Sequence, residues 1–307
     1  MKKTIDIICA GELLIDFIGN EINTPISEIE NYERFLGGSP TNVAIYGAKL
    51  GLKTTLAASC GNDGLGHFMV EKLNQNQVKT TLIEKTNDYP SSVIFVSKSN
   101  ATPEFIAYRQ ADFHINEAQI PDTVLEEAQI FHTTCFALSK NPARETILKK
   151  AKKALQLGLQ TSIDLNYSEK IWSDRKEAKE VIAAYLDTKP LVKLSDDDCF
   201  RLFNETKSDE EIIEYFRNLG ASAICLTKGK NGVSYWDSQL GVLHKEAPFV
   251  ENIKDTTGAG DAFWTGFLYG KLKGKTPLEC ITIAQKIAAI KLQHLGHLPD
   301  NIQVEKI

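Results

Sequence analysis

DTTGAGDAF, residues 255–263, is the most informative segment of the chain, and an apolar run over residues 264–272 follows it directly. The small residues 258–260 let the backbone turn tightly, and the apolar run predicts that a helix begins there. The first N–H groups of a helix have no partner within it and carry about half a positive charge, which favours a bound anion. Asp261 stands at this predicted helix start. A carboxylate there can take a proton from a hydroxyl while the N–H groups hold the charge of an arriving phosphoryl group.

A simpler interpretation is that Asp261 is only the N-cap of the helix. Aspartate is a common N-cap residue, and an isolated aspartate would favour this interpretation. It leaves the glycines and the two threonines of the same segment unexplained. We therefore favour Asp261 as a catalytic base, provided that the rest of the chain supplies a sugar pocket and a nucleotide pocket.

The composition is that of a globular protein. The 307 residues are 42% hydrophobic and 24% charged, and the length fits two domains or one large α/β domain with an appendage. The net charge of -5, with no basic block, argues against nucleic acid and acidic membranes as partners. No apolar stretch reaches membrane-spanning length, and the first residues lack the pattern of a signal peptide, so we expect a cytoplasmic protein.

The six cysteines are scattered singly, and no CxxC pair occurs. This pattern predicts small buried side chains and argues against a disulfide framework or a zinc site. His294 and His297 are three residues apart, but no carboxylate completes a metal motif with them.

Strands and helices are predicted to alternate along much of the chain. Strands are expected at residues 5–10, 13–18, 54–59, 78–84, 130–134, 159–164, 191–194 and 223–227, with helices near residues 43–50, 66–74, 143–157, 175–187, 209–219 and 277–295. This rhythm is typical of an open parallel sheet covered on both faces, in which ligands bind beyond the carboxyl ends of the strands. Asp164, Asn166, Lys193 and Thr227 fall at or just after those ends.

Two earlier segments carry polar groups in places that suit a ligand. Asp16 lies inside the apolar run GELLIDFI, where a carboxylate either bonds locally at a strand end or faces a polar ligand. In GGSPTN, Gly37 and Gly38 allow close approach of a ligand, and Asn42 offers a donor and an acceptor. A plain turn with a Ser or Thr helix cap explains GGSPTN equally well. Residues 20–35 between the two segments look polar and irregular.

Two ribbons interrupt the alternation of strands and helices. SSVIFVS (residues 91–97) and EFIAYR (residues 104–109) alternate as an antiparallel hairpin does, which predicts a small β lid inserted at about residues 18–36 and 90–113. Arg109 ends the second ribbon after Tyr108 and either points into solvent or reaches a ligand. Farther along, TKGKNG places Gly229 and Gly232 where they could lie against a flat base, or could form only a tight turn.

Together these motifs resemble the PfkB, or ribokinase-like, family of carbohydrate kinases, and most of all its fructokinases. DTTGAGDAF is the most specific of them, and GELLIDF, GGSPTNVA and EFIAYRQAD point the same way. The resemblance covers nearly the whole chain. It implies one Rossmann-like α/β domain over residues 1–307, with a doubly wound, mostly parallel sheet, helices on both faces and a small β lid. It also implies ATP as phosphoryl donor and Mg²⁺ as metal.

The resemblance further implies roles for individual residues. The catalytic set would be Asp261 as base, with the N–H groups of Gly258, Ala259, Gly260 and Asp261 as the anion hole. The sugar set would be Asp16, Gly37, Gly38 and Asn42, with Tyr108 and Arg109 from the lid. The nucleotide set would be Asn166, Lys193, Thr227, Gly229, Gly232 and Gln285. Asp198 would hold Mg²⁺ through water, and Asp255 and Thr257 would help to hold a monovalent cation such as K⁺.

The chain departs from the family pattern in three places. Residues 195–198 read SDDD where the family has Asn or Ser, two residues, then Glu, so Asp198 is one methylene shorter. Residues 164–172 read DLNYSEKIW where fructokinases have DPN and a basic residue, and the change at residues 167–170 weakens the nucleotide role of Asn166. Thr265 replaces a smaller residue, which is a minor packing change.

The activity expected from the sequence is ATP-dependent phosphorylation of a ketose, with D-fructose at O6 or O1 as the first choice. Kinases for 2-keto-3-deoxygluconate, ribose or nucleosides are alternatives within the family. An NAD-dependent dehydrogenase would share the sheet, but GELLID and not GxGxxG follows the first strand. A sugar sensor without catalysis stays open. The edges and apolar face of the lid predict a homodimer.

Overall fold

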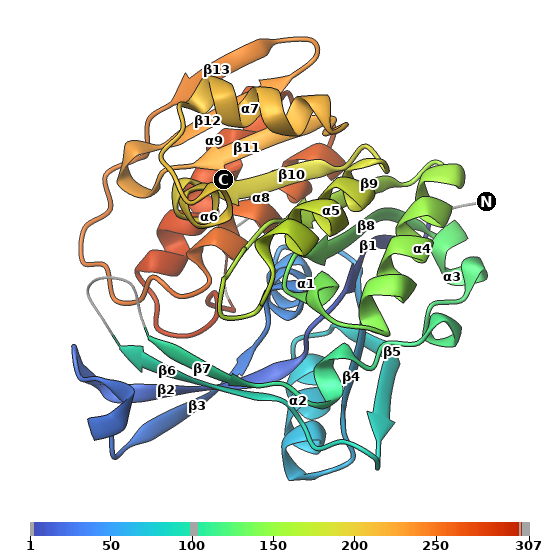
Figure 1. Ribbon diagram of the computed structural model, residues 1–307, viewed down its shortest axis with the longest axis vertical. Helices are drawn as coiled ribbons and strands as arrows, with labels where there is room; N and C mark the ends of the chain where they lie inside the picture. Colours follow the sequence, from blue (N-terminus) through green and yellow to red (C-terminus); the bar gives the residue numbers. More distant parts are fainter. Residues whose placement is uncertain (1–2, 99–103, 301, 303–307) are drawn as a thin grey trace.

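A nine-stranded sheet forms the centre of the computed structural model, which describes residues 3–98, 104–300 and 302. The strand order is β13-β12-β11-β10-β9-β8-β1-β4-β5 (Figure 1). The strands are β1 (Ile5–Ala10), β4 (Thr54–Gly61), β5 (Lys79–Thr86), β8 (Ala128–Thr134), β9 (Gln160–Asp164), β10 (Leu191–Ser195), β11 (Ala223–Thr227), β12 (Val233–Asp237) and β13 (Gly241–Lys245). All neighbours pair in parallel except β11 with β12 and β12 with β13. The carboxyl ends of the parallel strands therefore meet at one rim.

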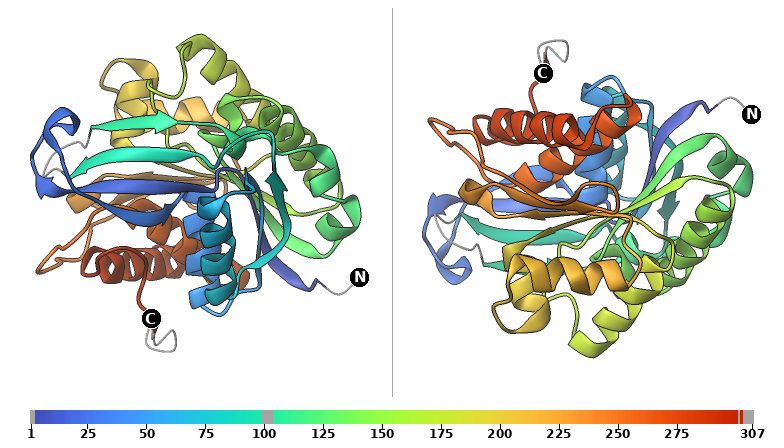
Figure 2. Two further views of the ribbon diagram at one scale, coloured as in Figure 1. Left: turned by 90° about the horizontal axis from the view of Figure 1, so that it is seen from below. Right: turned by 90° about the horizontal axis from the view of Figure 1, so that it is seen from above.

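Helices cover both faces of this sheet (Figure 2). One face carries α1 (Ser39–Lys49), α2 (Gly64–Gln75), α8 (Ala259–Leu272) and α9 (Pro277–Leu292). The other carries α3 (Asp122–Glu126), α4 (Ala143–Gln156), α5 (Arg175–Leu186), α6 (Asp196–Phe203) and α7 (Asp209–Asn218). Short 3-10 turns occur at Ile26–Glu28, Ala111–Phe113, Glu117–Gln119, Ala137–Ser139 and Gly229–Asn231. The predicted doubly wound α/β fold is confirmed.

Helix α8 is buried along most of its length because nearly every residue after its first turn is apolar. Trp264 and Phe267 are fully buried and stack with ring centroids 5.1 Å apart. The Trp264 Nε1–H donates to Ser162 Oγ at 3.0 Å, which ties the helix to β9. Burying one such side chain stabilises the fold by roughly 1.5–3 kcal/mol. This packing fixes the start of α8 at the rim of the sheet.

A four-stranded sheet of order β3-β2-β6-β7 forms the lid (Figure 1). Its strands are β2 (Leu14–Ile22), β3 (Tyr32–Gly37), β6 (Val93–Lys98) and β7 (Phe105–Tyr108). The prediction that residues 20–35 are irregular was wrong at the two ends of that segment, because β2 runs to Ile22 and β3 begins at Tyr32, whereas residues 23–31 between them lie outside the strands. Much of this part of the lid is exposed to solvent, so its strands carry polar residues. A polar composition was therefore read as irregular structure.

The cysteines and the longest helices of the described part of the chain can now be placed. All six cysteines are free and buried. Within those same ranges, no helix combines the length and the apolar character needed to cross a membrane.

Candidate active site

A cavity of about 280 Å³ lies where the lid, the strand ends and the start of α8 meet. The structure brings nine of the predicted site residues to it: Asp16, Gly38, Asn42, Asn166, Lys193, Thr257, Gly258, Gly260 and Asp261. It adds Asp164, which the sequence placed at the ligand-binding rim without a specific role, and five residues that the sequence did not single out: Glu12, Leu14, Ser39, Ile94 and Phe136. Residues that are more than 200 positions apart in the chain therefore share one site.

Asp261 is not the N-cap of α8. The N-cap is Gly258, whose φ of 73° is the left-handed conformation that glycine adopts readily, and Asp261 is the third residue of the helix. Its carboxylate accepts hydrogen bonds from Ser39 Oγ at 2.6 Å and from Asn42 Nδ2 at 2.7 Å, both in the first turn of α1. The carboxylate is thus held toward the cavity by a neighbouring helix and does not cap its own.

The backbone amides at this helix start have different surroundings. Ala259 N–H donates to the carbonyl of Thr256 at 3.2 Å, so the prediction that it belongs to the anion hole was wrong. Over the described residues, the N–H groups of Gly258, Gly260 and Asp261 have no acceptor within the chain. Free amides at a helix start favour an anion.

Lys193 places a positive charge beside these amides. Its Nζ lies 2.9 and 3.1 Å from the two carboxylate oxygens of Asp164 at the end of β9. A Cβ added to Gly260 would lie only 2.9 Å from the same Nζ, so the ammonium lies against the first turn of α8. Burial alone would lower the pKa of Lys193, but the nearby carboxylates, Asp164 first, raise it overall to about 12. The side chain therefore stays charged.

Asp16 of β2 supplies a second carboxylate to the cavity. A Cβ on Gly37 would lie 2.2 Å from Asp16 Oδ2, so glycine there makes room for the carboxylate. In the described part of the chain, no hydrogen-bond partner satisfies it. Burial, together with the charge of Asp261, raises the pKa of Asp16 to about 7. A carboxylate that faces the cavity without a hydrogen-bond partner can accept hydrogen bonds from ligand hydroxyls.

Burial raises the pKa of Asp261, and the hydrogen bonds from Ser39 and Asn42 partly offset that rise. A base must be ionised to accept a proton, so a raised pKa moves the loss of activity on the acid side to higher pH. Ser39→Ala removes one of the hydrogen bonds that hold the pKa down. We expect its profile of kcat/KM against pH to fall at a higher pH than that of the wild type. A fall at the same or a lower pH would contradict this assignment.

Glu12 and Ser39 are the most informative residues that sequence reasoning missed. Glu12 is buried and accepts hydrogen bonds from Ser39 N–H at 3.2 Å and Thr134 Oγ1 at 2.9 Å. Burial raises its pKa to about 8. Both residues lie inside motifs already noted, GELLIDF and GGSPTN, but only the fold shows that Glu12 supports the helix start that holds Asp261.

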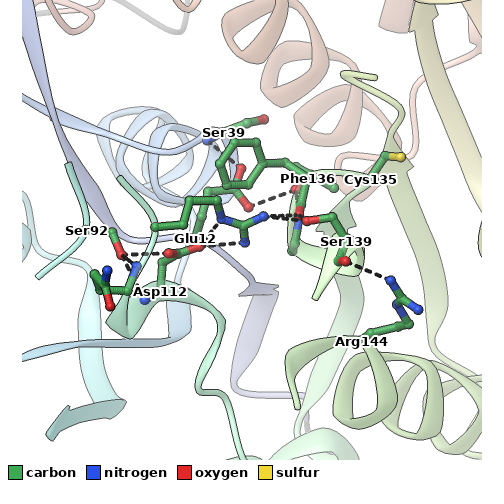
Figure 3. Close-up of polar contacts among 12 residues, drawn as sticks. Glu12, Ser39, Ser92, Asp112, Cys135, Phe136, Ser139 and Arg144 are labelled. Atoms are coloured by element: carbon green, nitrogen blue, oxygen red, sulfur yellow. Dashed lines mark hydrogen bonds and ion pairs between the residues drawn. The ribbon is translucent and has the colours of Figure 1, made fainter. Parts of the chain in front are cut away.

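Arg109 does not point into the cavity. Its guanidinium forms a buried ion pair with Asp112 at 2.6 Å and donates to Ser139 Oγ. Its Cζ lies 4.1 Å from the ring centroid of Phe136, which does line the cavity. Figure 3 labels these three partners, Asp112, Ser139 and Phe136. Arg109 therefore joins the end of the lid to the cavity wall, in place of the predicted contact with sugar.

Tyr108 also lies away from the cavity. Its side chain is largely exposed and meets Phe95 edge to face, with ring centroids 6.0 Å apart. It belongs to the surface of the lid.

The residues predicted on the nucleotide side divide into two groups. Asn166 and Lys193 line the cavity, whereas Thr227, Gly229, Gly232 and Gln285 do not. Gly232 has a φ of 90° at the entry to the β12–β13 hairpin, and Gln285 Nε2 donates to the carbonyl of Glu246 at 2.8 Å. Thr227 Oγ1 donates to the carbonyl of Leu194 at 3.2 Å. Thr227, Gly232 and Gln285 therefore each contribute to the local structure. The nucleotide roles of all four residues stay predictions.

The acidic side chains of the described residues do not form a metal-binding site by themselves. No group of three or more His, Cys, Asp or Glu is placed to hold a metal ion within the residues described. The Asp198 carboxylate accepts from Ser195 N–H at 2.9 Å and from Arg201 Nη2 at 3.0 Å. Mg²⁺ keeps several waters and binds mainly through substrate phosphates. Both carboxylate oxygens of Asp198 are thus already used, and Asp198 is not part of the cavity lining, so its role toward Mg²⁺ stays a prediction.

Comparison with known proteins gives a consistent result. The model of the pfkB family carbohydrate kinases matches residues 4–302. An ATP-dependent 6-phosphofructokinase of Thermoanaerobacterium thermosaccharolyticum is 31% identical over 99% of this chain and 93% of its own length. A fructokinase of Halothermothrix orenii has a TM-score of 0.80 at 30% identity, covering 92% of this chain and 98% of its own. A sugar kinase of Pyrococcus horikoshii in complex with ATP has a TM-score of 0.84 at 29% identity, covering 98% and 96%.

Proposed function

This chain belongs to the pfkB family of carbohydrate kinases, and we propose that within it the protein transfers the γ-phosphoryl group of ATP to a primary hydroxyl of a neutral ketose, with D-fructose as the first candidate. The family fixes the class of reaction, in which a sugar hydroxyl is the acceptor. The observation that supports the finer proposal is the charge of the cavity lining.

The cavity offers a group for each part of the transfer. Asp261 accepts the proton of the attacking hydroxyl, because its carboxylate faces the cavity and Ser39 and Asn42 fix its position. The amides of Gly260 and Asp261, with the ammonium of Lys193, stabilise the negative charge of the phosphoryl oxygens. Mg²⁺ bound to ATP would supply further positive charge on the phosphates.

The balance of charge at the cavity favours a neutral sugar over an anionic one. The carboxyl groups of Glu12, Asp16, Asp164 and Asp261 line it. Burial raises the pKa of Asp16 and of Asp164 to about 7, so both carry negative charge at and above neutral pH, whereas Glu12, with its pKa raised to about 8, is mostly protonated there. Lys193 is the single cation among the described lining residues and is already paired. The positive charge of Arg109 is neutralised by Asp112. A sugar phosphate or a sugar acid would therefore meet unfavourable charge in this cavity, whereas the hydroxyls of a neutral ketose can donate to Asp16.

Fructose 6-phosphate is a second candidate. It is favoured by the similarity to an ATP-dependent 6-phosphofructokinase along nearly the whole chain. The two candidates differ by one phosphate group, so kinetics with both sugars will separate them.

A coupled assay of ADP release over fructose, fructose 6-phosphate, 2-keto-3-deoxygluconate, ribose and a nucleoside tests the proposal. We expect kcat/KM for fructose to exceed that for each anionic sugar by roughly tenfold or more, the effect of about one unfavourable charged contact. A preference for fructose 6-phosphate would overturn the proposal of a neutral substrate. Sugar binding by calorimetry without any turnover would instead show a sensor.

A further inference from the structure

Lys291 is a buried cation close to the active site to which the reaction above gives no role. It lies in the last turn of α9, and its side chain is only 1% exposed. Its Nζ lies 2.9 Å from Asp255 Oδ2 and donates to the carbonyl of His294 at 3.2 Å. A buried ammonium needs such partners, and the negative end of the helix dipole also favours it.

The partner of Lys291 holds the loop that leads into α8. Asp255 Oδ1 accepts from Thr257 N–H at 2.9 Å, and Oδ2 accepts from Gly296 N–H at 3.2 Å. The N–H of the preceding residue, Lys254, donates to the carbonyl of Leu292 at 2.8 Å, at the end of α9. The segment that precedes the phosphate-binding amides is therefore fixed against the end of α9 through one carboxylate.

The same lysine reaches the start of α8. A Cβ added to Gly258, the N-cap of that helix, would lie 3.8 Å from Lys291 Cε. Lys291 thus packs against the turn at Gly258 but does not line the cavity, whereas Gly260 and Asp261 of the same turn do. A change in its charge would act on the position of these amides without touching the sugar or ATP directly.

A monovalent cation does not fit beside Asp255 in this arrangement. Its Oδ2 already accepts from the ammonium and from an amide, and its Oδ1 accepts from a second amide. A K⁺ ion in contact with this carboxylate would lie close to the buried charge of Lys291, and like charges repel strongly where water is excluded. The resemblance-based expectation that Asp255 and Thr257 hold K⁺ therefore conflicts with the residues present.

We propose that Lys291 is a positioning residue whose ammonium takes the place of a monovalent cation behind the phosphate-binding turn. It holds Asp255, and Asp255 holds residues 255–258, so that the amides of Gly260 and Asp261 keep their position for the phosphoryl group. Because the ammonium is covalently attached, catalysis does not depend on K⁺. The inference rests on the proposed phosphoryl transfer. The first experiment below gives different results if the phosphoryl transfer fails and if the role of Lys291 fails.

The wild-type protein provides the first test. With any sugar of the panel that is turned over, kcat in potassium, sodium and tetramethylammonium chloride at equal ionic strength should agree within about twofold. The thermal unfolding midpoint should also be the same in the three salts, because no site gains a bound cation. A rise of roughly fivefold in kcat, or a stabilisation specific to potassium, would overturn the inference. If no sugar is turned over, the proposed function fails, and the unfolding midpoints still decide this inference.

Lys291→Met provides the second test, with Lys150→Met as its matched control. Lys150 of α4 is also a buried lysine, with a side chain 6% exposed and an ion pair to Asp122 at 2.9 Å, but it does not line the cavity. We expect Lys291→Met to lower kcat by at least about tenfold while both KM values change by less than about threefold. Lys150→Met should lower the unfolding midpoint and leave kcat unchanged. A loss of stability alone in both variants would overturn the positioning role, and if Lys291→Met does not fold, the salt comparison decides.

Discussion

Asp261→Asn is expected to lower kcat by roughly 10²- to 10⁴-fold, the usual contribution of a general base. The amide has nearly the same size and shape as the carboxylate, but it cannot take the proton of the sugar hydroxyl. The variant should still bind ATP, because the helix amides and Lys193 that face the phosphates are unchanged. Steady-state kinetics with fructose and ATP will measure the effect, and KM for ATP should change little.

Asp174→Asn is the matched control for this variant. Asp174 is the N-cap of α5, and its carboxylate accepts from Lys176 N–H at 2.8 Å, with no place in the cavity lining. The same chemical change there should leave kcat as in the wild type. Full activity of Asp261→Asn would show that removal of a proton by this residue is not required.

Lys193→Met is expected to lower kcat by roughly 10²- to 10³-fold, since it removes a preorganised positive charge from the place where phosphoryl charge develops. It should also lower stability. Asp164 is buried, so loss of its partner leaves an unpaired charge, which typically costs about 3–5 kcal/mol in a buried pair. Kinetics and denaturant unfolding of the same preparation will measure the two effects.

A double variant separates the two effects of Lys193. Lys193→Met with Asp164→Asn removes both charges of the pair, so we expect much of the lost stability to return. The loss of kcat should remain, because the phosphates still lack the ammonium. Recovery of activity together with stability would mean that Lys193 acts only by supporting the fold.

The sequence predicts those parts of the site that depend on local pattern. The helix start at residues 258–260 follows from small residues before an apolar run, and the structure places it as expected. Asp164 and Lys193 were located at strand ends, and the parallel register of β9 and β10 then brings them face to face. In these places local sequence and tertiary structure agree, so simple periodicity was enough.

Contacts between distant segments could not be predicted in the same way. Ser39 and Asp261 are 222 positions apart, and Lys291 and Asp255 belong to the end of one helix and the loop before another. The pairing of Arg109 with Asp112 is local, but its burial depends on Phe136 and Ser139 from beyond β8. Which partner neutralises a buried charge is decided by packing, and the pattern of one segment does not contain that information.

A crystal structure of the Asp261→Asn protein with fructose and ATP bound tests the central claim most directly, because the slow variant should retain both substrates. We predict that the acceptor hydroxyl lies within hydrogen-bond reach of the residue 261 side chain, about 2.6–3.2 Å away, with the γ-phosphate against the amides of Gly260 and residue 261. A sugar whose primary hydroxyls all lie far from residue 261, or a γ-phosphate bound away from the start of α8, would contradict the assignment of Asp261 as the base.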